Sequence, residues 1–337
     1  MKQPFFRLFI LLCCLLCALP IKSQSAVGSW RSHLAYHNAT QCVTVGDKVY
    51  VVSDGSLYSY SPKDEFVENY NKTSILSDQG IRHIAADKSS GTLVIIYDNA
   101  NIDLIASDGT LTNITDYANK ITLDPTVNDL CIIGDNAYLA TNFGLTVLNV
   151  ARKEFGGTYM LNKTTYSCVE LHGVIYAATA EGIYSGNTKN NLQDISNWQK
   201  LNNEVYTQLT TFNEALIALK AKESVYHINT TNGNSALLRK GPFHFMHTAE
   251  DKLFVGNHIN IFEYETLDKA TLLTFEDNVS YLTTDGTTYW GACGTEGLNG
   301  YRYDKENKRI ERVVTKVIPN SPRRNHCQYL NFVNDER

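Results

Sequence analysis

The chain has 337 residues, of which 43% are hydrophobic and 19% are charged, and its formal net charge is -5. This hydrophobic share is sufficient for a large core and excludes a disordered polymer. The mild acidity, and the lack of a basic stripe interleaved with aromatic residues, give no electrostatic reason to expect nucleic acid as a partner.

Residues 1–25 are predicted to be a secretory signal peptide. Lys2 and Arg7 give a positive start, residues 9–19 form an apolar run, and small residues suitable for cleavage follow. No later segment reaches the ~20 consecutive apolar residues that are needed to cross a bilayer. We therefore expect an exported protein without a transmembrane span, either soluble or held to a membrane by a partner.

A short sequence motif then recurs along the chain. It consists of an apolar strand, a turn closed by glycine or a polar pair, and a second strand, and it reads most clearly at Tyr50–Tyr58, Tyr138–Val147 and Tyr176–Tyr184. Weaker copies lie at 253–259 and 289–298. A repeat of about 40 residues built from strands and tight turns is typical of a propeller blade.

Seven such units can be aligned, and the composition favours strands because tyrosine, valine, isoleucine and threonine suit a pleated surface. Their first strands begin near Gln41, Ile81, Val127, Tyr166, Thr207, Phe243 and Val279. The predicted fold is therefore all-β: a seven-bladed β-propeller with four-stranded antiparallel blades, spanning residues 26–320. Residues 204–222 could be read as a helix, but the repeat register favours strand, turn, strand.

The two ends of the propeller leave alternatives open. Residues 30–36 could add a strand to the last blade, or they could form a cap while residues 310–316 supply that blade's own outer strand. We expect the second arrangement, because every blade then has four strands. Residues 321–337 are expected to be the start of a following, truncated domain or a disordered tail. A fragment of a longer protein would explain the unpartnered strand pattern at 327–333.

Five cysteines remain after the signal peptide, an odd number without C-x-x-C spacing: Cys42, Cys131, Cys168, Cys293 and Cys327. Cys42, Cys131 and Cys168 stand at positions that look equivalent in three repeats, which indicates small buried residues rather than metal ligands. Export would permit a disulfide, but the sequence supplies no pairing. We expect these cysteines to pack in the core.

The residue pattern predicts no enzyme, no cofactor and no metal site. His244 and His247 would point to opposite sides of a strand, and no third ligand has suitable spacing. A glycosidase would need two carboxylates across a pocket, and nothing in the sequence pairs any two of the candidates: Glu170, Glu181, Glu204, Glu263 and Glu296. Neither a G-x-S-x-G motif nor a phosphate-binding loop is present.

Ligand-binding residues cannot be assigned from the sequence. The loop tips Asn142–Phe143, Glu181 and Asn257–His258 are plausible contact points. The sequence does not indicate which rim of the ring would face a ligand.

Two sets of residues carry a resemblance to known families. The repeats at 138–147 and 176–184 resemble those of the two-component-regulator propellers common in Bacteroidetes sensors. The segments 28–36 and 319–325 more specifically resemble the PorZ family, the β-propeller component of the type IX secretion system. That resemblance implies two consecutive propellers followed by a carboxy-terminal sorting domain, and this chain departs from it by lacking the second propeller and the sorting domain.

The resemblance also implies a function. The family acts at the outer membrane beside the sortase-like component of the attachment complex and presents anionic lipopolysaccharide for attachment to secreted cargo. The chain is accordingly predicted to be a non-enzymatic, exported interaction protein in the periplasm or at the cell surface, with attachment-complex proteins and anionic lipopolysaccharide as partners. The alternatives are a periplasmic ligand-sensing propeller of a two-component regulator and, less favoured, a carbohydrate-active enzyme.

Overall fold

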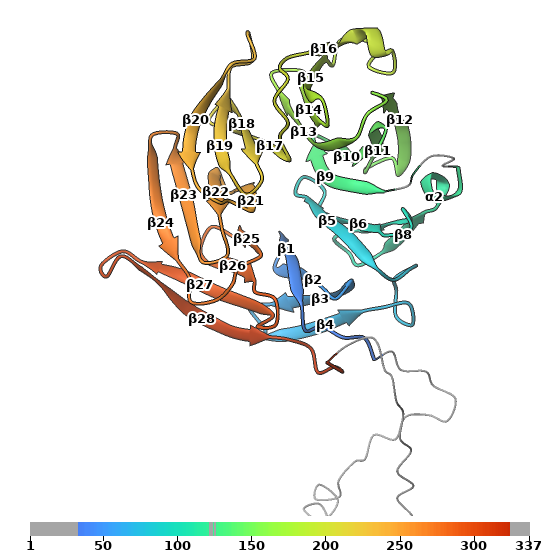
Figure 1. Ribbon diagram of the computed structural model, residues 1–337. Helices are drawn as coiled ribbons and strands as arrows, with labels where there is room; N and C mark the ends of the chain where they lie inside the picture. The colour runs from blue at the N-terminus through green and yellow to red at the C-terminus, as the bar shows by residue number, and fades with distance from the viewer. Residues whose placement is uncertain (1–32, 121–123, 125, 324–337) are drawn as a thin grey trace, which may run out of the picture. The chain divides into compact units, whose positions relative to one another are not determined.

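The computed structural model describes residues 33–120, 124 and 126–323, which form seven four-stranded antiparallel sheets arranged in a ring (Figure 1). In every sheet the strands are hydrogen-bonded in chain order. The first strand of each sheet lies nearest the centre of the ring and the fourth lies at its rim (Figure 1). The predicted seven-bladed β-propeller is confirmed.

Blades 1 to 4 take up the first half of the chain. Blade 1 consists of β1 (Ala39–Val45), β2 (Lys48–Ser53), β3 (Ser56–Ser61) and β4 (Phe66–Tyr70). Blade 2 consists of β5 (Ile81–Asp87), β6 (Thr92–Tyr97), β7 (Ile102–Ile105) and β8 (Leu111–Ile114). Blade 3 consists of β9 (Val127–Ile133), β10 (Asn136–Thr141), β11 (Gly144–Asn149) and β12 (Glu154–Met160). Blade 4 consists of β13 (Thr165–Leu171), β14 (Val174–Thr179), β15 (Gly182–Asn187) and β16 (Trp198–Lys200).

Blades 5 to 7 complete the ring. Blade 5 consists of β17 (Gln208–Phe212), β18 (Ala215–Lys220), β19 (Ser224–Ile228) and β20 (Ser235–Lys240). Blade 6 consists of β21 (Phe245–Ala249), β22 (Lys252–Gly256), β23 (Asn260–Thr266) and β24 (Lys269–Thr274). Blade 7 consists of β25 (Tyr281–Thr284), β26 (Tyr289–Ala292), β27 (Leu298–Asp304) and β28 (Arg309–Val317). Helical structure among the described residues is limited to α2 (Asp116–Lys120) and the 3-10 turn η1 (Ile195–Asn197).

The segment that could have been a helix, residues 204–222, forms a hairpin of β17 and β18. Asn213 and Glu214 join these strands with positive φ angles of 48° and 57°, the backbone geometry of a tight hairpin turn. The strand, turn, strand interpretation is therefore correct. The helix α2, which the sequence pattern did not indicate, occupies the connection that follows β8.

The blades bury their sheets on both faces. All six residues of each of β3, β6 and β11 are buried. Seven apolar clusters account for this burial, one at each junction between neighbouring blades. Because a fully buried aliphatic or aromatic side chain contributes roughly 1.5–3 kcal/mol, lateral packing of the blades is the main source of stability.

A recurring backbone contact links most blades to the next. The turn between the second and third strands is hydrogen-bonded to the segment that leads into the following blade. Ile81 N–H donates to Gly55 O at 2.9 Å, and Asn162 N–H donates to Phe143 O at 2.9 Å. In blade 5 the turn is the donor, since Lys222 N–H donates to Phe243 O at 2.8 Å. These bonds place the turns at equivalent positions on one face of the ring.

The ring closes between blades 7 and 1 without a covalent connection. Ala39 and Gly294 exchange two backbone hydrogen bonds of 2.9 and 3.0 Å. The Tyr58 hydroxyl donates to Val317 O at 2.8 Å, and Tyr36 packs edge-on against Tyr58 with ring centroids 5.8 Å apart. The outer strand of blade 7 is β28 from the same blade, as expected, and Tyr36 belongs to a segment that covers the junction. Trp30 lies outside the described residues.

The cysteines confirm one expectation and correct another. Cys42, Cys168 and Cys293 are buried, and the four cysteines in the described part of the chain are free. The predicted equivalence of Cys131 with Cys42 and Cys168 is wrong. Cys42 pairs with Val51 and Cys168 with Ala177. Cys131 instead pairs with Tyr138, one position nearer the turn that joins β9 to β10, and it is half-buried. Leu130 occupies the equivalent position in blade 3.

Several predictions concern parts of the chain that the structure does not describe. The signal peptide at 1–25, most of the segment at 321–337 and Cys327 lie outside the described residues. The domain limits at residues 26 and 320 accordingly remain predictions.

The ring closure can be tested with Tyr58→Phe. This substitution removes one hydroxyl and leaves the buried carbonyl of Val317 without its donor, which should cost about 1–3 kcal/mol. We expect a lower midpoint of urea unfolding, measured by tryptophan fluorescence. Tyr184→Phe is the matched control, because its hydroxyl contacts the exposed Glu181 carboxylate at 3.3 Å. Equal midpoints for the two variants would contradict this account of the closure.

Candidate functional site

The three loop tips suggested by the sequence all lie in turns between second and third strands, but they differ in exposure. Phe143 is only 9% exposed and packs into the cluster between blades 2 and 3. The Asn142 side chain donates to Asp124 Oδ2 at 2.5 Å and accepts from Asn128 Nδ2 at 3.0 Å. Asn142 and Phe143 therefore hold the turn in place and do not offer free groups to a ligand.

Glu181 and His258 are the exposed members of this set. The Glu181 carboxylate lies 3.4 Å from Lys163 Nζ, and that ammonium lies 4.8 Å from the centroid of the Tyr184 ring. The His258 ring stacks on His244 with centroids 4.6 Å apart, while Asn257 Oδ1 accepts hydrogen bonds within its own turn. These tips present small polar groups at the surface.

His244 and His247 do not meet. His244 is exposed and stacks on His258, whereas Nδ1 of His247 is 2.9 Å from the Tyr281 hydroxyl. Burial, together with the charge of Lys88, lowers the pKa of His247 to about 4. This imidazole is therefore neutral near pH 7 and serves as a packing and hydrogen-bonding group.

The five glutamates considered for glycosidase chemistry are each engaged with a different partner. Four form ion pairs with lysines: Glu181 with Lys163, Glu204 with Lys220, Glu263 with Lys252, and Glu296 with Lys316. The fifth, Glu170, accepts a hydrogen bond from Gly173 N–H in the turn of its own hairpin. The structure thus gives each of these carboxylates a local structural role.

The innermost strands carry a set of polar residues that sequence reasoning missed, called here the polar belt. They share one register position in blades 1 to 5: Gln41, His83, Asp129, Ser167 and Gln208. Most of them bond the backbone of the next blade. Ile84 N–H donates to Gln41 Oε1 at 3.1 Å, and Met246 N–H donates to Gln208 Oε1 at 2.9 Å. An alignment anchored on the second-to-third strand turns would have revealed this column.

His83 and Ser167 act in the same way, whereas Asp129 accepts from Leu130 N–H of its own strand at 2.9 Å. His83 Nε2 lies 3.0 Å from Val127 O, and Leu209 N–H donates to Ser167 Oγ at 3.3 Å. Burial lowers the pKa of His83 and raises that of Asp129. The inner polar groups therefore tie neighbouring blades together, and this leaves few of them free for a ligand at the centre of the ring.

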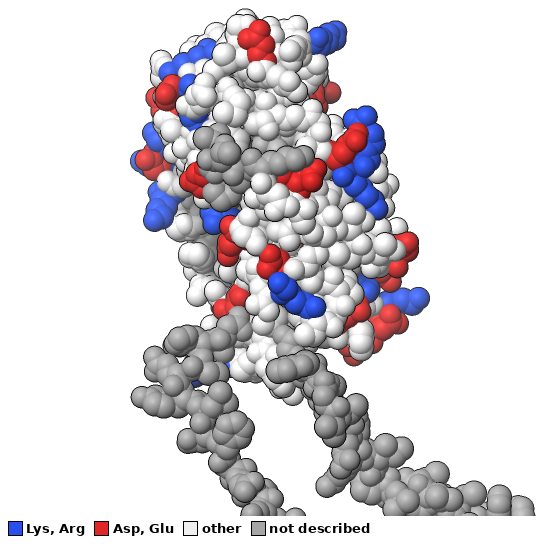
Figure 2. Space-filling view, turned by 90° about the vertical axis from the view of Figure 1, so that its right-hand side faces the viewer, with Lys and Arg blue, Asp and Glu red and all other residues white. Residues whose placement is uncertain are grey.

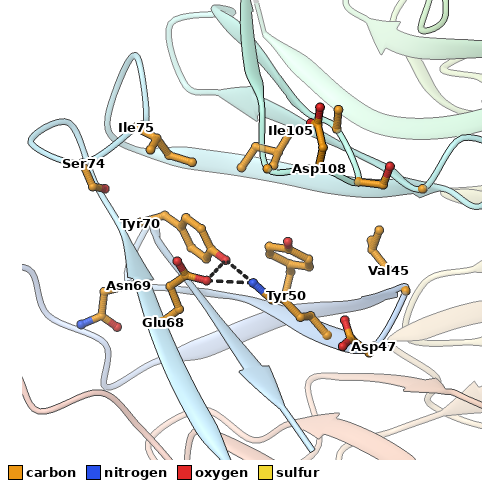
Figure 3. A pocket seen from close by; sticks show the side chains of 16 residues that line it. Val45, Asp47, Tyr50, Glu68, Asn69, Tyr70, Ser74, Ile75, Ile105 and Asp108 are labelled. Atoms are coloured by element: carbon orange, nitrogen blue, oxygen red, sulfur yellow. Dashed lines mark hydrogen bonds and ion pairs between the residues drawn. The ribbon is translucent and has the colours of Figure 1, made fainter. Parts of the chain in front are cut away.

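A cavity of about 430 Å³ lies between blades 1 and 2 (Figure 3). Its floor is formed by Tyr50 and Tyr70 of blade 1, whose ring centroids are 5.7 Å apart. Ile105 and the turn at 106–109 of blade 2 line the opposite side. Two separate blades build this cavity, so it depends on their lateral packing.

One hydrogen-bonded group dominates the cavity wall (Figure 3). Lys48 Nζ lies 2.8 Å from Glu68 Oε2, and the Tyr70 hydroxyl donates to the same oxygen at 2.7 Å. The bond between Lys48 and Glu68 raises the pKa of Lys48 and lowers that of Glu68. Burial raises the pKa of Tyr70. The ammonium is neutralised by its partner, and Asp47 and Asp108 add acidic groups at the edge.

The charges on one side of the ring are mixed (Figure 2). Figure 2 shows the side of the ring that carries α2 and β12, where lysine, arginine, aspartate and glutamate side chains are scattered among uncharged residues. No strongly basic surface is apparent on this side, so electrostatic steering of a polyanion toward it has no visible basis.

Comparisons with known proteins agree with this architecture. Residues 49–199 match the family model described as "TSS9, PorZ, N-terminal beta-propeller domain". Among solved structures, PorZ of Porphyromonas gingivalis matches with a TM-score of 0.82 and 27% identity, over 91% of this chain and 42% of the PorZ chain. The chain resembles the amino-terminal propeller of PorZ. That protein is described as an essential bacterial surface component of the type IX secretion system.

More distant structures share the fold alone. The extracellular domain of a putative hybrid two component system from B. thetaiotaomicron has a TM-score of 0.62 and 11% identity, covering 79% of this chain and 40% of its own. The WD40 propeller of Doa1 has a TM-score of 0.63 and 11% identity, covering 82% and 96%. No curated protein matches the sequence.

The resemblance to PorZ, which is described as a bacterial surface component, supports an exported protein. None of the helices in the described ranges is long and apolar enough to span a membrane. The chain spans less than half the length of the PorZ chain that it matches.

The lowered pKa of His247 implies a specific dependence of stability on pH. Its pKa of about 4 in the folded protein lies below its ordinary value of 6.5, so the unfolded chain binds more protons between these two pH values. The contribution of His247 is complete above about pH 6.5 and is lost as the pH falls toward 4. We expect His247→Asn to lose less of its unfolding free energy than the unsubstituted protein between pH 7 and pH 4.5, in urea titrations.

The exposed His172 provides the control, because it lies in a turn at a φ of 53° that asparagine tolerates. His172→Asn should keep the pH profile of the unsubstituted protein. Parallel profiles for His247→Asn and the unsubstituted protein would contradict the assignment of a neutral, buried imidazole.

Proposed function

We propose that this chain is a non-enzymatic, exported interaction propeller of the type IX secretion system, which presents anionic lipopolysaccharide to the attachment complex at the outer membrane. The observation that carries the proposal is the similarity to PorZ over 91% of the chain at a TM-score of 0.82. Attachment-complex proteins, including the sortase-like component, would be its protein partners.

Rigid presentation is the proposed mechanism. Blades that bury both faces, and turns that are bonded to neighbouring segments, hold the surface loops in fixed positions. A scaffold of this kind can orient a glycolipid for another protein without itself making or breaking bonds. The ion pairs of the candidate glutamates agree with a role in which no glycosidic bond is cleaved.

The cavity between blades 1 and 2 is the proposed sugar subsite. Its only lysine is paired with Glu68, and Asp47 and Asp108 lie at its edge, so a phosphate or carboxylate placed there would be repelled. Hydroxyl groups, in contrast, can bond to carboxylates, to Asn69 and to the Tyr70 hydroxyl. The uncharged sugar units of the polysaccharide, and not its anionic groups, are therefore proposed to occupy this cavity.

Binding of purified anionic lipopolysaccharide to the purified chain tests both parts of the proposal. Ser107→Trp places a large ring at the exposed turn that lines the cavity. We expect it to weaken binding at least about tenfold, the loss that corresponds to 1.4 kcal/mol, in biolayer interferometry. Thr231→Trp is the control, because it also replaces a small hydroxyl-bearing residue with tryptophan, in an exposed turn of blade 5.

The outcomes separate the two claims. A folded, unsubstituted protein that binds neither the lipopolysaccharide nor the sortase-like partner would overturn the proposed role. Binding that is unaffected by Ser107→Trp would overturn only the assignment of the cavity. Turnover of any substrate in a panel of glycosides would show that the protein is an enzyme.

A further inference from the structure

Cys131 and Cys168 face each other across the junction of blades 3 and 4. Cys131 lies on β9 and Cys168 on β13, the innermost strands of these two neighbouring blades. Both side chains belong to the apolar cluster that fills this junction, together with Tyr138 and Ile175. Two cysteines from separate sheets thus occupy one interface.

The alternation of side chains along each strand explains this meeting. The neighbours of Cys131, Leu130 and Ile132, pack toward blade 2. Val169, which follows Cys168, packs toward blade 5. The shift of Cys131 by one register position, which broke its apparent equivalence with Cys168, is therefore what turns its thiol toward blade 4.

Both thiols lie in this one cluster, and the nearby Cys131 together with burial raises the pKa of Cys168. Cys168 is 1% exposed, whereas Cys131 is half-buried. An incoming reagent can therefore reach Cys131, and Cys168 is shielded behind it.

We propose that Cys131 and Cys168 form a disulfide that crosslinks blades 3 and 4 when the chain meets a thiol-oxidising compartment. The export that would bring it there is part of the proposed function, but the chemistry itself requires only a disulfide-bearing oxidant as co-reactant. No other described pair is placed in this way: Cys42 Sγ contacts Trp290 O, and Cys293 Sγ contacts the Tyr301 hydroxyl.

The reaction is a thiol–disulfide exchange with a disulfide-bearing oxidant, either an oxidoreductase or oxidised glutathione. The Cys131 thiolate attacks one sulfur of the oxidant, forms a mixed disulfide and releases the first thiolate. The Cys168 sulfur then attacks the sulfur of Cys131 and releases the second. Both cysteines are oxidised, the oxidant is reduced by two electrons, and the two protons pass to the released thiolates.

Peptide mapping of the purified chain tests the proposal directly. The protein is incubated with oxidised glutathione, unfolded in the presence of iodoacetamide, and digested with trypsin, which places Cys131 and Cys168 in different peptides. We expect a linked pair of peptides carrying these two cysteines, which dithiothreitol separates, and a rise of several degrees in the thermal unfolding midpoint. Cys42 and Cys293 should remain alkylated.

Cys131→Ser should abolish the linked peptides and the rise in midpoint, while Cys42→Ser, the matched change at a buried cysteine on β1, should retain the linked peptides. Alkylation of both Cys131 and Cys168 after oxidation of the folded protein would overturn the proposal, as would a link from either residue to Cys42, Cys293 or Cys327. Because the mapping uses no lipopolysaccharide, its result is independent of the binding experiment. The unsubstituted protein alone gives a decisive answer if a variant fails to fold.

Discussion

The packing between the last blade and the first is the interaction on which the rest of the structure depends. Every blade exposes two apolar faces that only a neighbour can cover, and six of the seven junctions are supported by continuous chain. At the seventh, the backbone pair of Ala39 and Gly294 and the bond from Tyr58 to Val317 replace the covalent connection. Trp290, which is 1% exposed, and Tyr60 add an aromatic contact there with ring centroids 5.8 Å apart. Opening this junction would expose apolar surface on both blades, so the ring is stable only when closed.

The polar belt explains why the ring can be rigid at its centre. Side chains such as Gln41 and Gln208 accept backbone N–H groups of the next blade, so that polar groups of the inner strands are satisfied by neighbouring protein atoms. An unsatisfied buried donor would cost about 1–3 kcal/mol. The same bonds leave the inner strands with little to offer a ligand. A ligand therefore finds more available groups between blades further from the centre, for example in the cavity beside Tyr70.

Much of the fold could be predicted from the sequence, because the residues of the local turns define the repeat. Pairs such as Asp54–Gly55 specify hairpins, and counting them gave the seven blades and located β5 and β9 at their first residues. The exposure of individual side chains to solvent was harder to predict. Phe143 was considered a loop tip, yet it is buried by blade 2, a contact between units that no local pattern encodes.

The error at Cys131 has a physical cause that applies more widely. Aligning the repeats by a shared residue type treated Cys131 as equivalent to Cys42. The distance of each residue from the hairpin turn determines the register instead. A shift of one residue in a strand moves a side chain to the opposite face. The cavity between blades 1 and 2 was unpredictable for a related reason, since Lys48 and the turn at 106–109 meet only through the docking of two blades.

These observations separate two ways of stabilising the propeller. A crosslink between blades 3 and 4 joins strands that the chain already connects, so it acts mainly by restricting the unfolded chain between Cys131 and Cys168. A ligand held between blades 1 and 2 acts on the folded state, because only a packed junction forms the cavity, and its effect grows with ligand concentration. The two junctions share no residue, so the two contributions to stability should add. Oxidation would then strengthen the scaffold while leaving the affinity of the cavity unchanged, which is the behaviour that a presenting surface requires.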